Sequence, residues 1–192
     1  MFATLLDPAA FACAPDSNPA IQLVECPELT TSEPAVREAL TARLVALAGR
    51  HRALLPVGGN LVGLSREEWL LLPAESLVIN PIRDPESWRA AATWPGDRGL
   101  ILALVPAPGD EEPEPVEVLL WAVRYAASLG GRGLDRVGVS GMLPTAKASP
   151  VHSEAERRIA LLERLVQLSS ANEETLRAEL DSRAFQPIER PR

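Results

Sequence analysis

Short apolar runs rich in strand-forming residues alternate with longer amphipathic stretches along most of the chain. The run from Leu100 to Val105 is apolar at every position, which is typical of a strand covered on both faces in a parallel sheet. Because helical periodicity follows each such run, the pattern predicts an α/β fold of tandem βα units with a mainly parallel sheet. We predict five strands, at residues 21–25, 53–57, 76–80, 99–105 and 136–140.

The amphipathic stretches carry signals for the ends of helices. Ser32 opens the first predicted helix, with Pro34 in its first turn, and this helix ends near Gly49. Ser65 and Glu68 have the spacing of a capping box for a short second helix. Further helices are predicted from Asp84 to about Trp94, from Val116 to Gly130, from Ser153 through Val166 and from about Asn172 to Ser182.

Several apolar side chains on these helices are expected to pack toward the sheet. Ile159, Leu162 and Val166 share one face at helical spacing, so we expect all three to be buried. The four tryptophans fall on predicted helices or their ends, and we expect them to cover the sheet: Trp69, Trp88, Trp94 and Trp121.

Right-handed crossovers allow two architectures for such a chain, and periodicity does not choose between them. One is part of a (β/α) barrel, and the alternative is an open doubly wound sheet. We expect a single domain over residues 1–192, with an irregular segment over 1–20 and a loose tail over 184–192. Because a partial barrel exposes two sheet edges, we expect the N-terminal segment, a second copy or a separate chain to cover an edge.

Composition narrows the function classes. Hydrophobic residues make up 46% of the 192 residues, which is enough for a sizeable core. The net charge of −7 opposes binding to nucleic acid and to anionic lipid. No apolar run is long enough to span a membrane, and no Lys or Arg precedes the first apolar residues, so we predict a cytoplasmic protein without a secretory signal. In that compartment Cys13 and Cys26 are expected to be free thiols, with a disulfide between them as the alternative.

Ligands of parallel α/β folds bind at the carboxyl ends of the strands. Arg83 closely follows the third predicted strand, and a guanidinium group can bind a carboxylate through two parallel hydrogen bonds. The alternative for Arg83 is a structural ion pair. The candidate binding residues at the strand ends are Glu25, Asn60, Asn80, Arg83 and Ser140.

Three other motifs are incomplete. Gly58-Gly59-Asn60 has neither dinucleotide-binding nor P-loop spacing, so a tight turn competes with phosphate binding as its meaning. Gly138-Val139-Ser140-Gly141-Met142 departs from a nucleophile elbow because its second glycine comes one position early. The acidic residues of segment 110–114 suit a hard cation, but a charged surface loop is the commoner meaning of such a segment.

The order of the strand blocks resembles the C-terminal part of cobalamin-independent methionine synthase and its barrel superfamily, which includes uroporphyrinogen decarboxylase. The similarity extends from about Ile21 to Ser169 and begins with Ile21-Gln22-Leu23-Val24-Glu25-Cys26-Pro27-Glu28-Leu29, which looks like that family's strand ending in an acidic pair, Pro and Leu. The resemblance implies a barrel of which this chain holds about five of the eight strands. It continues at residues 55–60, 77–83, 100–105 and 137–142.

The resemblance also implies a zinc site, whose ligands this chain lacks. The family holds zinc with a His-x-Cys in the second block, a Glu in the third and a Cys in the fifth, and the metal makes the substrate thiol a thiolate. Here Pro56 and Gly58 take the first two positions, Asn80 takes the third, and residues 140–143 contain no Cys. Only Glu25 remains of the acidic pair. We therefore expect no metal, no cofactor and no zinc-dependent methyl transfer.

Three hypotheses of function follow, in order of preference. The first is a non-catalytic, shortened relative of the methionine synthase barrel that acts as a binding or structural partner of another protein or of a second copy. The second is an enzyme or binder of a small carboxylate or one-carbon substrate that uses the five candidate residues. The third is a nucleotide-binding Rossmann-like module, which depends on Gly58-Gly59-Asn60 alone.

Overall fold

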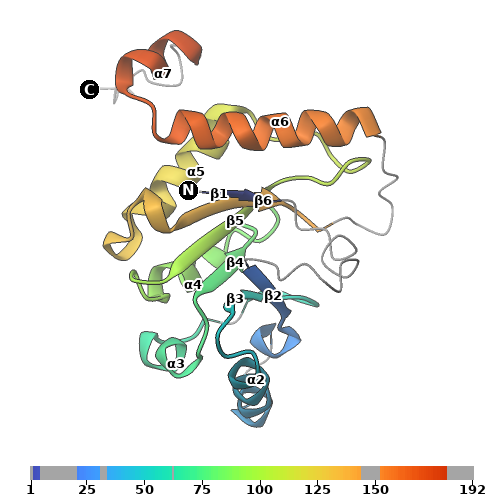
Figure 1. The fold of residues 1–192 in the computed structure, drawn as a ribbon, viewed down its shortest axis with the longest axis vertical. Coiled ribbons are helices and arrows are strands. Elements are labelled where there is room, and N and C mark those ends of the chain that lie inside the picture. The colour runs from blue at the N-terminus through green and yellow to red at the C-terminus, as the bar shows by residue number, and fades with distance from the viewer. Residues whose placement is uncertain (1, 5–20, 31–33, 62, 144–151, 181–192) are drawn as a thin grey trace, which may run out of the picture.

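Six strands form one sheet in which every described pairing is parallel. The computed structural model describes residues 2–4, 21–30, 34–61, 63–143 and 152–180. The order across the sheet is β1-β6-β5-β4-β3-β2 (Figure 1), which confirms the predicted α/β class. The strands are β1 (Phe2–Thr4), β2 (Ile21–Glu25), β3 (His51–Leu55), β4 (Ser76–Ile79), β5 (Gly99–Val105) and β6 (Val137–Gly141).

Helices α2 to α5 each connect one strand to the next, and α6 and α7 follow β6. The helices lie in an arc around one side of the sheet, from α6 beside β1 and β6 to α2 beside β2 (Figure 1). None of the described helices is both long enough and apolar enough to cross a bilayer. The α-helices are α2 (Pro34–Ala46), α3 (Arg66–Leu71), α4 (Ser87–Thr93), α5 (Val116–Ser128), α6 (His152–Ser169) and α7 (Glu173–Glu179). Short 3-10 helices are η1 (Pro27–Thr30), η2 (Leu129–Gly131) and η3 (Leu134–Arg136).

Burial shows which face of the sheet the helices cover. Leu54 and Leu77 belong to the larger core cluster, which also contains buried residues from all six α-helices. Ala53 and Val78 alternate with them and form a second cluster on the opposite face. From β2 to β6 the strand order follows the chain without reversal, which is the winding of a partial barrel. The sheet is nevertheless open, because β1 and β2 are its two edges.

β1 was not predicted, because residues 1–20 were expected to be irregular. Phe2 pairs with Gly138 and Thr4 with Ser140, so this short strand covers the outer edge of β6. A strand of three residues is too short to give a periodic signal in the sequence. The pairing agrees with the expectation that N-terminal residues cover an edge, whereas residues 5–20 and the predicted tail over 184–192 lie outside the described residues.

Two predicted core positions are wrong. The side chains of Ile159 and Trp121 are 40% and 60% exposed. On α6 the buried positions include Arg158, Leu162 and Leu165, so the inward face is rotated about the helix axis relative to the prediction. Trp69 and Trp94 are buried as predicted, and their rings meet edge to face with centroids 5.2 Å apart. β3 also begins and ends two residues earlier than predicted, before the proline that cannot donate to the ladder.

Arginines bind the carbonyl groups that end the helices, at the amino end of the sheet. Arg52 Nη1 donates to the carbonyl oxygen of Leu44 on α2 at 2.9 Å. Arg98 Nη1 donates to the carbonyl oxygens of Trp69 and Leu72 at the end of α3, at 3.0 and 2.8 Å. The last carbonyls of a helix have no partner within it, so these contacts satisfy groups that would otherwise be left unpaired.

Arg132 binds two helix ends at once and has no exposed surface. Burial lowers the pKa of its guanidinium group. Its nitrogens donate to five backbone carbonyls and so connect the turn after α4 to the turn after α5. The five carbonyls are those of Arg98 at 3.0 Å, Ala126 at 3.2 Å, Leu129 at 3.4 Å, Trp94 at 3.3 Å and Pro95 at 3.3 Å.

Replacing Arg132 should therefore cost more stability than replacing an exposed arginine. We expect Arg132→Met to lower the free energy of unfolding by about 3–5 kcal/mol, since buried carbonyls lose their donors. Arg177→Met is the control, because that side chain is 69% exposed and, within the described residues, pairs only with Glu173 on the same helix. Urea denaturation measures both, and equal small losses would contradict the role given to Arg132.

Arg52 also pairs with Glu75, with nitrogen–oxygen distances of 2.5 and 3.1 Å. Burial acts to raise the pKa of Glu75, but the hydrogen bonds and charge of Arg52 outweigh burial and hold this pKa below its ordinary value. A carboxylate whose pKa is lower in the folded protein stabilises the fold above its unfolded pKa. That contribution is lost as the pH falls through the folded pKa.

Glu75→Gln should flatten the acid side of the stability profile. The variant lacks the titrating charge, so its free energy of unfolding should fall less steeply than that of the wild type below about pH 4.5. Urea denaturation at a series of pH values from neutral to acid measures the difference. Parallel profiles for the two proteins would show that the Arg52–Glu75 pair does not contribute to acid sensitivity.

Candidate functional site

A cavity of about 140 Å³ lies at the carboxyl ends of β3, β4 and β5. Pro56 follows β3, Asn80 follows β4 and Leu143 follows β6, and all three line this cavity. Apolar side chains such as Val78 and Ala103 form much of its wall. The cavity is therefore at the end of the sheet where the sequence predicts a binding site.

The structure brings only two of the five predicted site residues to this cavity. Asn80 and Arg83 line it. Glu25 and Asn60 are exposed and are not among the described residues that line it. Ser140 is fully buried within β6, with its Oγ 3.5 Å from the carbonyl oxygen of Leu102. The five residues are thus not one site.

A turn held by Asn80 positions Arg83. The side-chain Oδ1 of Asn80 accepts a hydrogen bond from the backbone N–H of Arg83 at 3.0 Å, and its backbone oxygen accepts one from Asp84 N–H at 2.8 Å. Asparagine favours such turns because its side chain bonds the backbone that follows it. Ser87 then donates from Oγ to the carbonyl oxygen of Asp84 at 2.6 Å, at the start of α4.

Arg83 forms structural ion pairs with two carboxylates in this arrangement. Its Nη2 lies 3.0 Å from Asp110 Oδ2 and its Nε lies 3.2 Å from Glu111 Oε1. Its Nη1 donates to the carbonyl oxygen of Leu143 at 3.2 Å. The side chain of Asp110 is only 7% exposed, against 30% for that of Arg83. Two carboxylates next to one guanidinium group leave a net negative charge, which opposes capture of a third carboxylate.

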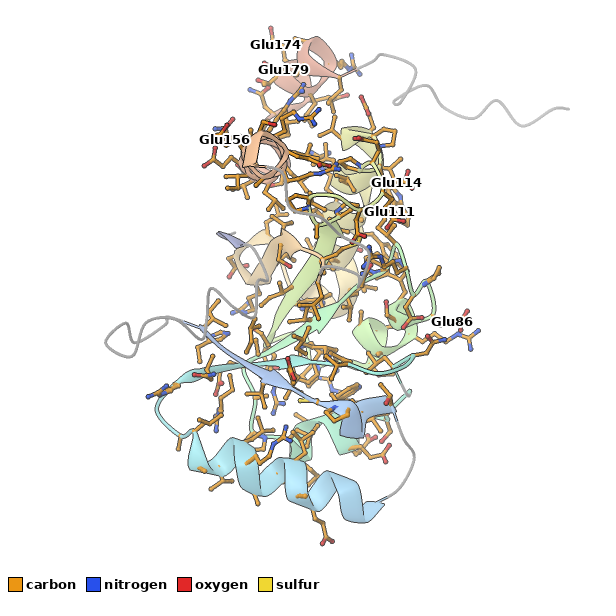
Figure 2. All side chains as sticks on the ribbon, turned by 90° about the vertical axis from the view of Figure 1, so that its right-hand side faces the viewer. Glu86, Glu111, Glu114, Glu156, Glu174 and Glu179 are labelled. Carbon is orange, nitrogen blue, oxygen red and sulfur yellow. The ribbon has the colours of Figure 1, made fainter. Side chains whose placement is uncertain are left out.

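A second arginine holds the acidic segment from the other side. Arg158 on α6 lies 3.5 Å from Glu112 and 2.7 Å from Glu154, and it donates to the carbonyl oxygen of Glu111 at 3.1 Å. Hydrogen bonds from the side chain of Arg158 and from the backbone N–H of Gly109 lower the pKa of Glu154. The Glu154–Arg158 spacing of four residues was the sequence signal for this pair. Figure 2 shows Glu111 and Glu114 on this acidic segment, on the same side of the molecule as Glu86.

The other motifs also have structural roles. Gly58 has a φ of 87°, and a Cβ on Gly59 would lie 3.3 Å from Thr30 Cβ, so the Gly58-Gly59 segment forms a tight turn packed against η1. Cys26 is buried, and its Sγ lies 2.9 Å from the carbonyl oxygen of Val24, while Cys13 lies outside the described residues. Within the described ranges, no three His, Cys, Asp or Glu side chains are grouped closely enough to hold a metal ion.

An exposed aromatic cluster on α4 and α5 was missed by the sequence analysis. The rings of Trp121 and Tyr125 stack with centroids 5.2 Å apart and planes 5° from parallel. Trp88 meets them edge to face, with centroid distances of 6.4 and 4.9 Å. Trp121 is 60% exposed, Tyr125 38% and the adjacent Val118 42%. We call Trp88, Val118, Trp121 and Tyr125 the aromatic surface; the spacing of Trp121 and Tyr125 by one helical turn was its only signal in the sequence.

Removing Arg83 should destabilise the fold through Asp110. Arg83→Gln takes the guanidinium group from a nearly buried carboxylate, so we expect the free energy of unfolding to fall by about 1–3 kcal/mol. Arg83→Gln with Asp110→Asn should recover part of this loss, because the double variant also removes the carboxylate charge. Urea denaturation measures both. Calorimetric titration with acetate tests the other role: saturable binding that Arg83→Gln abolishes would show that Arg83 does bind ligand carboxylates.

Comparisons with known proteins provide no family assignment. No protein-family model matches the chain. No curated protein matches it significantly.

Proposed function

We propose that this chain is a zinc-less, shortened relative of the methionine synthase barrel that acts as a binding protein and has no methyltransferase activity. Three loop positions support the relationship. Pro56, Asn80 and Leu143 come from different strand ends and line one cavity. The resemblance assigns zinc ligands to these positions, but Pro56, Asn80 and Leu143 carry none of the thiolate, imidazole or carboxylate groups that zinc prefers.

The backbone at Gly58 also supports the loss of zinc. The resemblance places the family's cysteine at this position, where φ is 87°. L-residues rarely adopt that conformation, so a cysteine here would be strained. The turn thus suits glycine rather than a metal-binding cysteine.

A binding role agrees better than catalysis with the positions and contacts of the candidate residues. Arg83 is held by two carboxylates, and Ser140 is buried within the sheet. Glu25 is exposed on the strand at one edge, away from the described cavity residues. General acid–base or nucleophilic catalysis needs reactive groups within hydrogen-bond reach of each other and of a substrate. The geometry of these three residues does not provide such a set.

The aromatic surface is the best candidate for protein binding. Trp and Tyr contribute most to binding energy at protein interfaces, because they bury a large area and lose little conformational entropy. Trp121 is the most exposed tryptophan described, and its stacking on Tyr125 holds both rings in place before any partner binds. A preformed surface of this kind reduces the entropy cost of association.

Charge around Trp121 favours a second copy of this chain as the partner. Glu117 lies one helical turn before Trp121, and the exposed Arg124 lies one turn after it. When two α5 helices pack antiparallel about a two-fold axis near Trp121, each Glu117 comes opposite the Arg124 of the other copy. An interface limited to α4 and α5 is small, so the expected dimer is weak, with a dissociation constant in the micromolar range.

Substitution of Trp121 tests this dimer. Sedimentation velocity of the wild type should give a weight-average mass that rises with concentration through the micromolar range. Trp121→Ser should weaken the association at least about tenfold, because it removes the central aromatic group. Arg124→Glu should weaken it as well, and Glu117→Arg combined with Arg124→Glu should restore it, since the exchange recreates the opposite charges.

A matched control lies on another helix. Leu71 on α3 is 76% exposed, and Leu71→Ser removes a comparable apolar group outside the aromatic surface, so this variant should associate like the wild type. A wild type that stays monomeric at the highest concentration would overturn the proposed dimer. Stoichiometric zinc in the purified protein would overturn the proposed loss of the metal site.

A further inference from the structure

The pairing of β2 with β3 fixes which backbone groups of β2 point toward its open outer edge. The backbone N–H of Cys26 donates to the carbonyl oxygen of Leu55 at the end of β3, at 2.8 Å. In a strand, the N–H and C=O of one residue point to the same side, and successive residues point to opposite sides. Val24 therefore also faces β3, whereas Leu23 and Glu25 direct their backbone groups outward. No strand pairs with this outer edge among the described residues.

Side chains occupy both of these outward carbonyls. Gln22 Nε2 donates to the carbonyl oxygen of Leu23 at 3.3 Å, and Arg43 Nη2 from α2 donates to that of Glu25 at 2.6 Å. Arg50 holds Gln22 in position, with its Nη1 3.2 Å from Gln22 Oε1. The bond from Arg43 carries a full positive charge, which makes it stronger than a bond between neutral groups.

The strand would otherwise be a good template for another strand. Its sequence, Ile21-Gln22-Leu23-Val24-Glu25, has high strand propensity, one charge and neither Pro nor Lys. Exposed edges of this kind add strands from other chains unless charge, bulges or side chains block them. An added strand needs the outward N–H and C=O groups of alternate residues. On β2 two of the three carbonyls of that set, those of Leu23 and Glu25, are already bonded.

We propose that Gln22 and Arg43 close the outer edge of β2 to strand addition, and that the partner they exclude is β2 of another copy of this chain. The closed edge limits the partial barrel to six strands and prevents the sheet from continuing between molecules. The two copies offer identical strands, so pairing two opened edges about a two-fold axis forms one continuous sheet.

The test opens the edge in a protein that lacks the aromatic contact. Gln22→Val and Arg43→Met are combined in a Trp121→Ser background, so that association through the aromatic surface does not contribute. Valine keeps the strand propensity, and methionine keeps the helix propensity and the apolar stem of arginine. We expect sedimentation velocity to show association at least tenfold tighter than in Trp121→Ser alone. Arg89→Met in the same background is the control, because the Arg89 side chain is 81% exposed and its one ion pair in the described part of the chain is with Glu86.

Hydrogen exchange identifies the surface that associates. In the parent protein the outward amides of Leu23 and Glu25 should exchange much faster than the amide of Val24, which faces β3. In the opened variant these two amides should become protected at least tenfold as the concentration rises. Unchanged slow exchange in β3 shows that the variant is folded, which separates true edge pairing from aggregation of unfolded chains.

Each other outcome overturns the proposal. A folded variant that stays as monomeric as its parent shows that the two side chains do not close the edge. Association without protection of Leu23 and Glu25 places the contact elsewhere. Protection of these amides in the parent shows that the edge is already paired. The proposed aromatic dimer fails separately, when Trp121→Ser associates like the wild type.

Discussion

The binding of helix-terminal carbonyls by arginine guanidinium groups is the interaction on which this fold depends. Each turn from a helix into the next strand buries carbonyls that the helix cannot satisfy. A guanidinium group carries five donors in a fixed plane and a charge that suits the negative end of a helix. Arg132 uses this geometry to join two such turns with no carboxylate bonded to it among the described residues, and Arg52 and Arg98 bind the ends of α2 and α3, the helices before β3 and β4. The spacing of the helices on the sheet follows from these contacts.

The two ends of the sheet use arginine differently. At the amino end Arg98 and Arg132 bind backbone carbonyls, and Arg52 binds both a carbonyl and the carboxylate of Glu75; these contacts stabilise the fold itself. At the carboxyl end Arg83 and Arg158 bind the side chains of Asp110, Glu112 and Glu154, and so they fix one acidic loop over the end of the sheet. The carboxylates of that loop are already paired with the guanidinium groups that a small anion would need. Parallel α/β proteins bind their ligands at this end of the sheet, whereas in this chain the charged side chains there bind one another.

The sequence was sufficient for the fold class, because periodicity depends on few residues at a time. The apolar run of β5 and the capping box of α3, with Ser65 and Glu68 bonding each other's backbone, are both as predicted. The candidate site was less predictable, because its residues meet only through tertiary structure. Arg83 could be named from its position after a strand, but its partner Asp110 is 27 residues away and gave no signal. Trp121 was expected to cover the sheet because a helical position alone cannot tell an apolar side chain that stays exposed from one that packs inside.

The pairing of β1 with β6 has a consequence for the order of folding. β2 to β6 are neighbours in both sequence and sheet, so each can pair soon after its predecessor forms. Phe2 and Gly138, by contrast, are partners 136 positions apart, and their contact closes more than two thirds of the 192-residue chain into a loop. A strand of three residues has few contacts to offset that entropy. We therefore expect β1 to be the last strand to join the sheet, and the first to leave it when the protein opens locally.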